Sequence, residues 1–144
     1  MTAPAAPLVF IVDDDSSVRR SLARLVRAAG FDVETFASAG EFLARPRYDG
    51  VSCLVLDVRM PGQTGLDLQE TLAAAEQRVP IVFITGYPDV RAHVTAMEGG
   101  AIDFLSKPVN DKDLLDAIER AVTKSRRQHD QARITEIQRS IPVA

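Results

Sequence analysis

Short apolar runs separated by helical patterns leave this chain few folds that it can adopt. Runs at Leu8–Val12, Cys53–Leu56 and Ile81–Ile84 are typical of strands buried on both faces of a sheet, and Ala101–Leu105 is expected to be a fourth buried strand. Phe31–Phe36 instead alternates apolar and polar residues, as an edge-side strand does. Strand and helix patterns alternate five times, which favours an open parallel sheet with helices on both faces.

Residues able to cap a helix stand at the starts of most of the expected helices. A side-chain oxygen at this position accepts hydrogen bonds from backbone N–H groups that the first turn leaves unpaired. A further helix is expected over Val90–Glu98, and Gly30 is placed to end the first helix. The expected caps are Asp15, Ser38 with Glu41, Thr64 with Asp67, and Asn110.

The composition excludes several classes of protein. With 144 residues, 46% of them hydrophobic and 26% charged, the chain suits one soluble domain. A formal net charge of −3 gives no electrostatic reason to expect direct nucleic-acid binding. No stretch approaches the ~20 apolar residues of a transmembrane helix, and residues 1–7 resemble a disordered lead rather than a signal peptide. The single cysteine, Cys53, excludes an internal disulfide and fits a reducing cytoplasm.

Polar residues follow the apolar runs at the points where a parallel sheet would gather them. Asp13 and Asp14 come after the first run, and Asp57 ends another. Because the carboxyl ends of parallel strands form one edge, we expect these side chains, with Thr85 and Lys107, to converge there. Clustered carboxylates repel one another, and a hard cation such as Mg²⁺ relieves the repulsion. The pattern predicts phosphoryl transfer to Asp57, the carboxylate isolated at the end of a central strand.

A set of motifs in fixed order carries a resemblance to a known family. They are Ile11-Val12-Asp13-Asp14-Asp15, Leu56-Asp57-Val58-Arg59-Met60-Pro61-Gly62, Ile84-Thr85-Gly86, Gly100-Ala101-Ile102-Asp103-Phe104-Leu105 and Lys107-Pro108. Over roughly Leu8 to Lys124, the chain resembles the receiver domains of bacterial two-component response regulators. The segment Ile84-Thr85-Gly86-Tyr87-Pro88-Asp89-Val90 is similar to the FixJ-like subgroup in particular.

The resemblance implies a flavodoxin-like (βα)5 fold, a doubly wound parallel five-stranded sheet of strand order 2-1-3-4-5 with an extended C-terminal helix. It also implies a phosphoprotein whose acceptor, Asp57, is phosphorylated by a sensor histidine kinase and which promotes its own phosphorylation and dephosphorylation. It is expected to be a switch rather than an enzyme with a separate substrate. The implied roles are Mg²⁺ binding by Asp13, Asp14, Asp57 and the Arg59 backbone carbonyl; phosphoryl contacts from Thr85 and Lys107; and a switch ring at Phe104 that moves from exposed to buried.

The expected output lies on the face made by the fourth helix, fifth strand and fifth helix. The division predicted is a lead over 1–7, a receiver domain over 8–124, and a helical extension or linker over 125–144, where Ile134, Ile137 and Ile141 form an apolar seam. Homodimerisation on phosphorylation is a further expectation. The chain is either a single-domain regulator with a protein effector or the receiver part of a FixJ-like transcription regulator whose DNA-binding domain is missing.

Three other classes compete with this interpretation. A dehalogenase-type phosphatase needs a second aspartate two residues after the nucleophile, where this chain has Arg59. A flavodoxin-like cofactor binder needs a Gly, Ser or Thr-rich phosphate cradle after the first strand, where this chain has Asp13, Asp14 and Asp15. A pseudo-receiver that serves only as an interaction module stays open.

Overall fold

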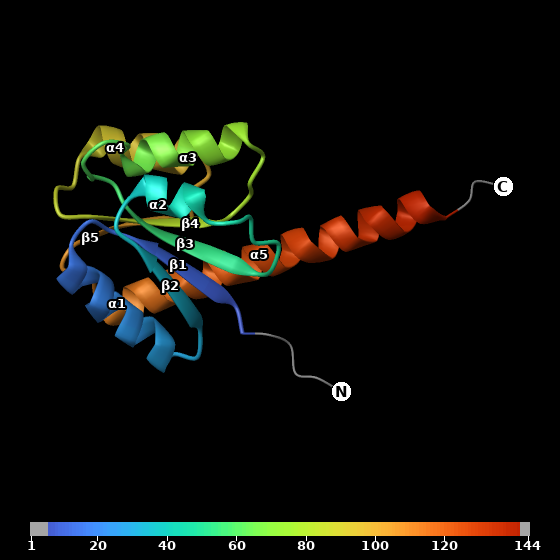
Figure 1. The fold of residues 1–144 in the computed structure, drawn as a ribbon, viewed down its shortest axis with the longest axis horizontal. Coiled ribbons are helices and arrows are strands. Elements are labelled where there is room, and N and C mark those ends of the chain that lie inside the picture. The colour runs from blue at the N-terminus through green and yellow to red at the C-terminus, as the bar shows by residue number, and fades with distance from the viewer. Residues whose placement is uncertain (1–5, 142–144) are drawn as a thin grey trace.

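The computed structural model describes residues 6–141 and shows one parallel sheet wrapped by helices (Figure 1). The predicted disordered lead at 1–7 falls mostly outside the described residues. The five strands are ordered β2-β1-β3-β4-β5, as predicted, and every neighbouring pair is parallel. In chain order the elements are β1 Leu8–Val12, α1 Ser16–Ala28, β2 Asp32–Phe36, α2 Ala39–Ala44, β3 Ser52–Asp57, α3 Gly65–Ala74, β4 Ile81–Thr85, α4 Val90–Glu98, β5 Asp103–Ser106 and α5 Asp111–Ser140.

Side chains that alternate along the central strands fill two separate cores. Phe10 and Leu54 point to the face covered by α2, α3 and α4, whereas Val9 and Cys53 point to the face covered by α1 and α5. All five residues of β1 and of β4 and all six of β3 are buried. Continuous apolar runs are therefore the expected sequence of these strands, because both faces of the sheet are covered.

The helix starts follow the predicted caps. Asp15 Oδ1 accepts hydrogen bonds from the backbone nitrogens of Ser17 and Val18, at 2.8 and 3.3 Å. Thr64 and Asp67 form a complete capping box at the start of α3. These local interactions confirm the starts read from the sequence. The other predicted caps also accept at helix starts: Ser38 Oγ from Glu41 N, and Asn110 Oδ1 from Asp113 N, each at 3.1 Å.

The last strand differs from its prediction in position and burial. The run Ala101–Leu105 was expected to be a fully buried strand, but β5 spans Asp103–Ser106 and only Phe104 within it is buried. The physical reason is its place at the edge of the sheet, where it pairs with β4 alone. An edge strand lacks the second neighbour that buries a central one, so its apolar residues overstate its burial.

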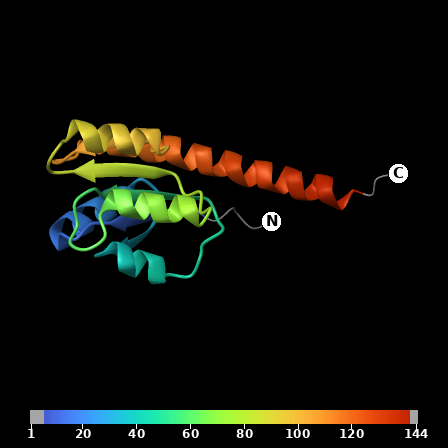
Figure 2. The ribbon, with the colours of Figure 1, turned by 90° about the horizontal axis from the view of Figure 1, so that it is seen from above.

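Helix α5 continues well past the sheet (Figure 2). It runs without a break across the predicted boundary between residues 124 and 125, and Ser125 is still buried, with its Oγ accepting a 3.0 Å hydrogen bond from Ser52 N. Ile134 and Ile137, in the projecting part, are about half exposed. The division at 124/125 stays a prediction, but packing on the sheet extends at least to Ser125. Among the described residues, no helix combines the length and apolarity needed to cross a membrane.

Candidate functional site

Three carboxylates meet where β1 and β3 end. Asp57 is the last residue of β3. Asp13 directly follows β1, the strand that is hydrogen-bonded to β3 in the sheet. Carboxylate oxygens of Asp13, Asp14 and Asp57 all lie within 4.8 Å of one another. Asp13 and Asp57 are buried, at 0% and 4% exposure, while Asp14 is exposed. The convergence predicted from parallel strands is therefore present in the structure.

Lys107 supplies the positive charge at this edge. It follows β5, and its backbone nitrogen donates a 2.7 Å hydrogen bond to the carbonyl of Thr85 at the end of β4. Its Nζ lies 2.7 Å from Asp13 Oδ2 and 3.3 Å from Asp57 Oδ2. Burial opposes the charge of Lys107, but the two carboxylates outweigh it and raise the pKa of the amine. The ammonium group therefore bridges the two buried aspartates. The Lys107–Pro108 peptide bond is cis.

The pKa of Asp57 is raised to about 6. Burial is the largest cause, and the negative charge of Asp13 adds to it. The ammonium of Lys107 and the 3.3 Å hydrogen bond from Arg59 N to Asp57 Oδ1 act in the opposite direction. Because burial and Asp13 disfavour the ionised form of Asp57, a further cation at the site would stabilise that form.

The arrangement suits a divalent metal ion. Asp13 Oδ1 accepts a 2.9 Å hydrogen bond from Asp15 N. Asp13 Oδ2, by contrast, is fully buried and lacks a hydrogen-bond partner within the described part of the chain, although Lys107 Nζ is close enough for an ion pair. A buried carboxylate oxygen in that condition is costly unless charge compensates it. Oxygen ligands of this kind are those that Mg²⁺ prefers, so the residues fit the predicted ion.

Thr85 is fully buried, but its hydroxyl is engaged with its own loop. Thr85 Oγ1 accepts a 3.1 Å hydrogen bond from Tyr87 N and lies 3.2 Å from the Tyr87 carbonyl oxygen. The guanidinium of Arg59 sits over the exposed Tyr87 ring, 5.2 Å from its centre. Residues on the loops after β3 and β4 thus touch each other beside the acidic cluster.

Phe104 does not show the exposed orientation expected at the start of its switch. Its ring is 9% exposed and lies 6.2 Å from the ring of Phe83 and 4.8 Å from that of His93, centre to centre. The predicted movement from exposed to buried stays a prediction, since the structure holds the buried orientation.

Two neighbours of the site were missed from the sequence. Gly65, the first residue of α3, packs against the backbone carbonyl of Asp57 so closely that a Cβ at this position would overlap that oxygen. Its backbone nitrogen donates a 2.9 Å hydrogen bond to the Val58 carbonyl. The second is His93, whose stack on Phe104 joins α4 to β5. For Gly65, the available sequence signal was a glycine directly after a capping threonine. The stack of His93 on Phe104 leaves no sequence signal, because the two rings come from different elements.

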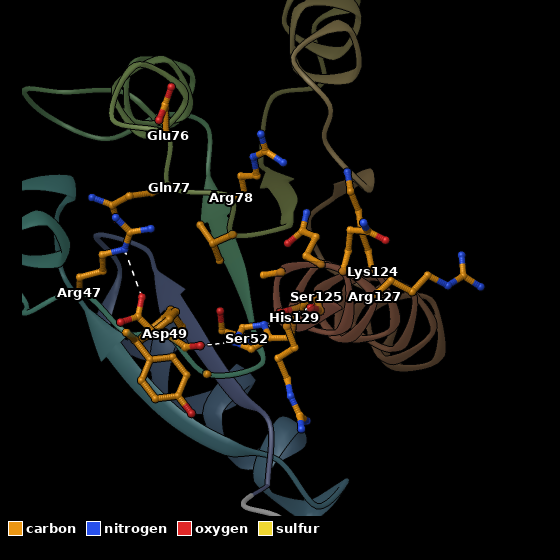
Figure 3. Close-up of a pocket in the computed structure, with 18 of the residues that line it drawn as sticks. Arg47, Asp49, Ser52, Glu76, Gln77, Arg78, Lys124, Ser125, Arg127 and His129 are labelled. Atoms are coloured by element: carbon orange, nitrogen blue, oxygen red, sulfur yellow. Dashed lines mark hydrogen bonds and ion pairs between the residues drawn. The ribbon is translucent and has the colours of Figure 1, made fainter. Parts of the chain in front are cut away.

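A large open groove of about 1140 Å³ lies at the opposite end of the strands (Figure 3). The segments before β3 and β4 and helix α5 form most of its wall, and α2 contributes as well. Its lining includes Arg78 and Arg127 as well as Glu76, and Arg47 pairs with Asp49 at 3.3 Å. None of the predicted site residues lines the groove, so its size does not make it the place of the strand-end chemistry.

The fold and the site together define a class of protein. A parallel sheet ordered 2-1-3-4-5, with a carboxylate cluster and a lysine at the carboxyl ends of its strands, is a doubly wound α/β domain with a polar site at its switch point. The family described as "Response regulator receiver domain" matches residues 9–119. The chain belongs to this family, whose members act in two-component signal transduction.

Full-length relatives extend beyond the part that this chain matches. Nodulation protein W of Bradyrhizobium diazoefficiens is 49% identical over 131 residues, which cover 91% of this chain and 58% of that protein. Response regulator protein TodT of Pseudomonas putida is 41% identical over 133 residues, covering 92% of this chain and 59% of its own length. The chain therefore spans about three fifths of the curated relatives that it matches.

Solved structures agree with this assignment. The response regulator StyR has a TM-score of 0.84 and 51% identity, covering 93% of this chain and 67% of that one. The FixJ-N structure has a TM-score of 0.72 and 40% identity, covering 81% of this chain and 94% of its own. These similarities confirm the FixJ-like receiver predicted from the motifs.

Proposed function

We propose that this domain is a phosphorylation switch in which Asp57 accepts a phosphoryl group from a sensor histidine kinase. The observation that carries the proposal is the position of the Asp57 carboxylate, within 4.8 Å of Asp13 and Asp14 oxygens and 3.3 Å from Lys107 Nζ. Phosphoryl transfer depends mainly on positioning and on neutralising charge, and this cluster provides both.

In the proposed step, one carboxylate oxygen of Asp57 attacks the phosphorus atom of a phosphohistidine. The new O–P bond gives an acyl phosphate, the P–N bond breaks, and its electron pair stays on the imidazole nitrogen. Lys107 Nζ, already 3.3 Å from Asp57 Oδ2, is placed to pair with an oxygen of the transferred group. The receiver thereby contributes to its own phosphorylation. The same groups would assist the later hydrolysis of the acyl phosphate by water.

A bound Mg²⁺ would neutralise the negative charge of the phosphoryl group during transfer. The residues that would hold it are Asp13, Asp14 and Asp57, with the backbone carbonyl of Arg59. The support is the buried Asp13 Oδ2, which has an ion-pair neighbour in Lys107 and no hydrogen bond from the residues described.

Thr85 and Phe104 would convert phosphorylation into a change of surface. To reach a phosphoryl oxygen, the Thr85 hydroxyl must leave the backbone of Tyr87, to which it is now bonded. Thr85 pairs with Ser106 in the sheet, and Phe104 lies two residues before Ser106 on β5. Thr85 is therefore close enough to Phe104 that its movement would alter the packing of the Phe104 ring and the face made by α4, β5 and α5.

The output is a protein partner or a domain that follows α5. Two relatives, FixJ and TdiR, are described as transcriptional regulatory proteins, and this chain spans 57% and 55% of their lengths. We favour the receiver part of such a transcription regulator, acting in the cytoplasm and dimerising through the α4, β5 and α5 face. A single-domain regulator that contacts a protein effector is the second candidate.

The decisive experiment is phosphorylation by acetyl phosphate, followed by intact mass spectrometry. We expect a gain of one phosphoryl group that requires Mg²⁺, disappears in Asp57→Asn and persists in Asp130→Asn, a variant of an exposed aspartate on α5. If neither acetyl phosphate nor a histidine kinase labels the wild type, the domain is a pseudo-receiver and the proposed function is wrong. Sedimentation with and without beryllofluoride, a phosphate mimic, tests the proposed dimer. We expect the mimic to increase the sedimenting mass.

A further inference from the structure

Helix α4 has few anchors on the rest of the domain. Ala96 is its only fully buried residue, while Val90, Val94 and Met97 are 80%, 48% and 40% exposed. The Gln69 side chain donates a 3.0 Å hydrogen bond from Nε2 to the Ala96 carbonyl. Elements with little buried apolar surface are among the first to move or open locally, so each remaining contact of α4 matters for its position.

One of these contacts is an aromatic stack between α4 and β5. The rings of His93 and Phe104 are 4.8 Å apart between centres, and their planes differ by only 8°. His93 is exposed and Phe104 is buried, so the imidazole forms part of the cover over the phenyl ring. On the sheet side, Phe104 has a second aromatic neighbour, Phe83 of β4, at 6.2 Å.

We propose that His93 is a positioning residue that holds Phe104 in its buried orientation and fixes α4 against β5. Phe104 can turn outward only by giving up its contacts with His93 and Phe83, so the stack stabilises the inward state. An aromatic pair of this kind shifts a two-state ratio about two- to tenfold. The proposal rests on the proposed function in one respect, the role of Phe104 as the switch ring.

The stack also completes a continuous path from the acidic site to the surface. Asp57 pairs with Ile84 in the sheet, Thr85 follows Ile84, and β4 pairs with β5 so that Phe83 lies beside Phe104. His93 then connects Phe104 to α4, whose neighbouring residue Val94 is exposed to partners. A change in the Phe104 ring is thus transmitted to α4 through His93.

The test follows the Phe104 ring by NMR in the unphosphorylated chain, with ring-labelled phenylalanine and the signal assigned from Phe104→Leu. In His93→Ala we expect weaker contacts between the Phe104 and Phe83 rings and an outward population two- to tenfold larger than in the wild type. His93→Phe restores a flat ring at this position and should return the signal toward that of the wild type. Val94→Ala, which shortens an exposed side chain on the same helix, is the matched control.

The proposal is overturned if His93→Ala leaves the Phe104 signal unchanged, or if Val94→Ala alters it as much. Urea unfolding of each variant shows that it is folded during the measurement. Acetyl phosphate labelling of the wild type separates the two hypotheses. If the wild type is not labelled but the Phe104 ring is displaced in His93→Ala, only the proposed function is contradicted. If the wild type is labelled normally but the ring does not move in His93→Ala, only the role of His93 is contradicted.

Discussion

Lys107 pairs most closely with Asp13, at 2.7 Å between Nζ and Oδ2, although Asp57 is the predicted acceptor. The distance from the same Nζ to Asp57 Oδ2 is 3.3 Å. The two buried carboxylates thus share one ammonium group, and the negative charge of Asp13 helps to raise the pKa of Asp57. This coupling gives the site measurable properties in the absence of any phosphoryl donor.

The first prediction concerns the pKa of Asp57, which is about 6 in the wild type. Asp13→Asn removes the negative charge that is the second-largest cause of this raised value and leaves Lys107 free to move toward Asp57. We expect a lower Asp57 pKa in the variant, measured by carboxyl ¹³C NMR titration in EDTA. Asp130→Asn, far along α5, should leave the titration unchanged. An equal or higher pKa in Asp13→Asn would show that burial alone sets the value.

The raised pKa also predicts how stability depends on pH. The folded-state pKa of about 6 exceeds the ordinary value of 3.8, so the folded protein binds more protons between these values and loses stability as pH rises from about 4 to 6. Asp57→Asn lacks this ionisation. In EDTA it should be more stable than the wild type by about 2–3 kcal/mol at pH 7.5, and the difference should shrink toward pH 4. Urea unfolding across the range measures it, and a difference that does not vary with pH would contradict the prediction.

Magnesium should stabilise the domain through the carboxylate cluster. A ligand at 100 times its dissociation constant stabilises the folded state by about 2.7 kcal/mol, which for a chain of this size raises Tm by several degrees. Asp14 is exposed, so Asp14→Asn should fold normally yet need at least a tenfold higher Mg²⁺ concentration for the same shift. Asp130→Asn provides the control for general ionic effects. Equal shifts in all three proteins would place the ion elsewhere.

Gly65 predicts a steric limit beside the phosphoacceptor. A methyl group there would overlap the Asp57 carbonyl oxygen and lie 3.1 Å from the Val58 Cα, so α3 or the end of β3 must shift. Gly65→Ala should cost about 1–3 kcal/mol of unfolding free energy and slow acetyl phosphate labelling. Gly40→Ala, in helix α2 with its nearest contact at 3.8 Å, should instead stabilise by about 0.5–1 kcal/mol. If both substitutions stabilise, the close approach at Gly65 is not a constraint.

Ser125 should anchor the long helix to the sheet. Its hydroxyl accepts the buried backbone N–H of Ser52, and Ser125→Ala leaves that donor unpaired, at a cost of about 1–3 kcal/mol. Ser140→Ala, at the exposed end of α5, should change stability by no more than about 0.5 kcal/mol. Hydrogen exchange at Ser52 gives a local reading, since its amide should lose protection in Ser125→Ala. Unaltered protection would mean that other contacts hold this part of α5.

The elements and the convergence of the site could be predicted because both depend on short-range patterns. Continuous apolar runs identify strands covered on both faces, and a parallel sheet brings the residues after those strands to one edge. The positions of Asp13, Asp57 and Lys107 follow from that rule alone. The expected burial of Ala101–Leu105 was too high, since the residues of a strand do not reveal that β5 has a single neighbour in the sheet.

Strand and helix positions along the chain, the helix caps and the meeting of the carboxylates are encoded locally, because they depend on periodicity within one segment and on the general geometry of parallel sheets. Three contacts instead emerge from the folded domain: Lys107 lies nearer to Asp13 than to Asp57, the Thr85 hydroxyl bonds to Tyr87, and Phe104 lies against His93. The physical reason is that such contacts join side chains from separate elements or loops. Their distances are set by packing across the whole domain, on a scale of about an ångström that no periodicity in the sequence encodes.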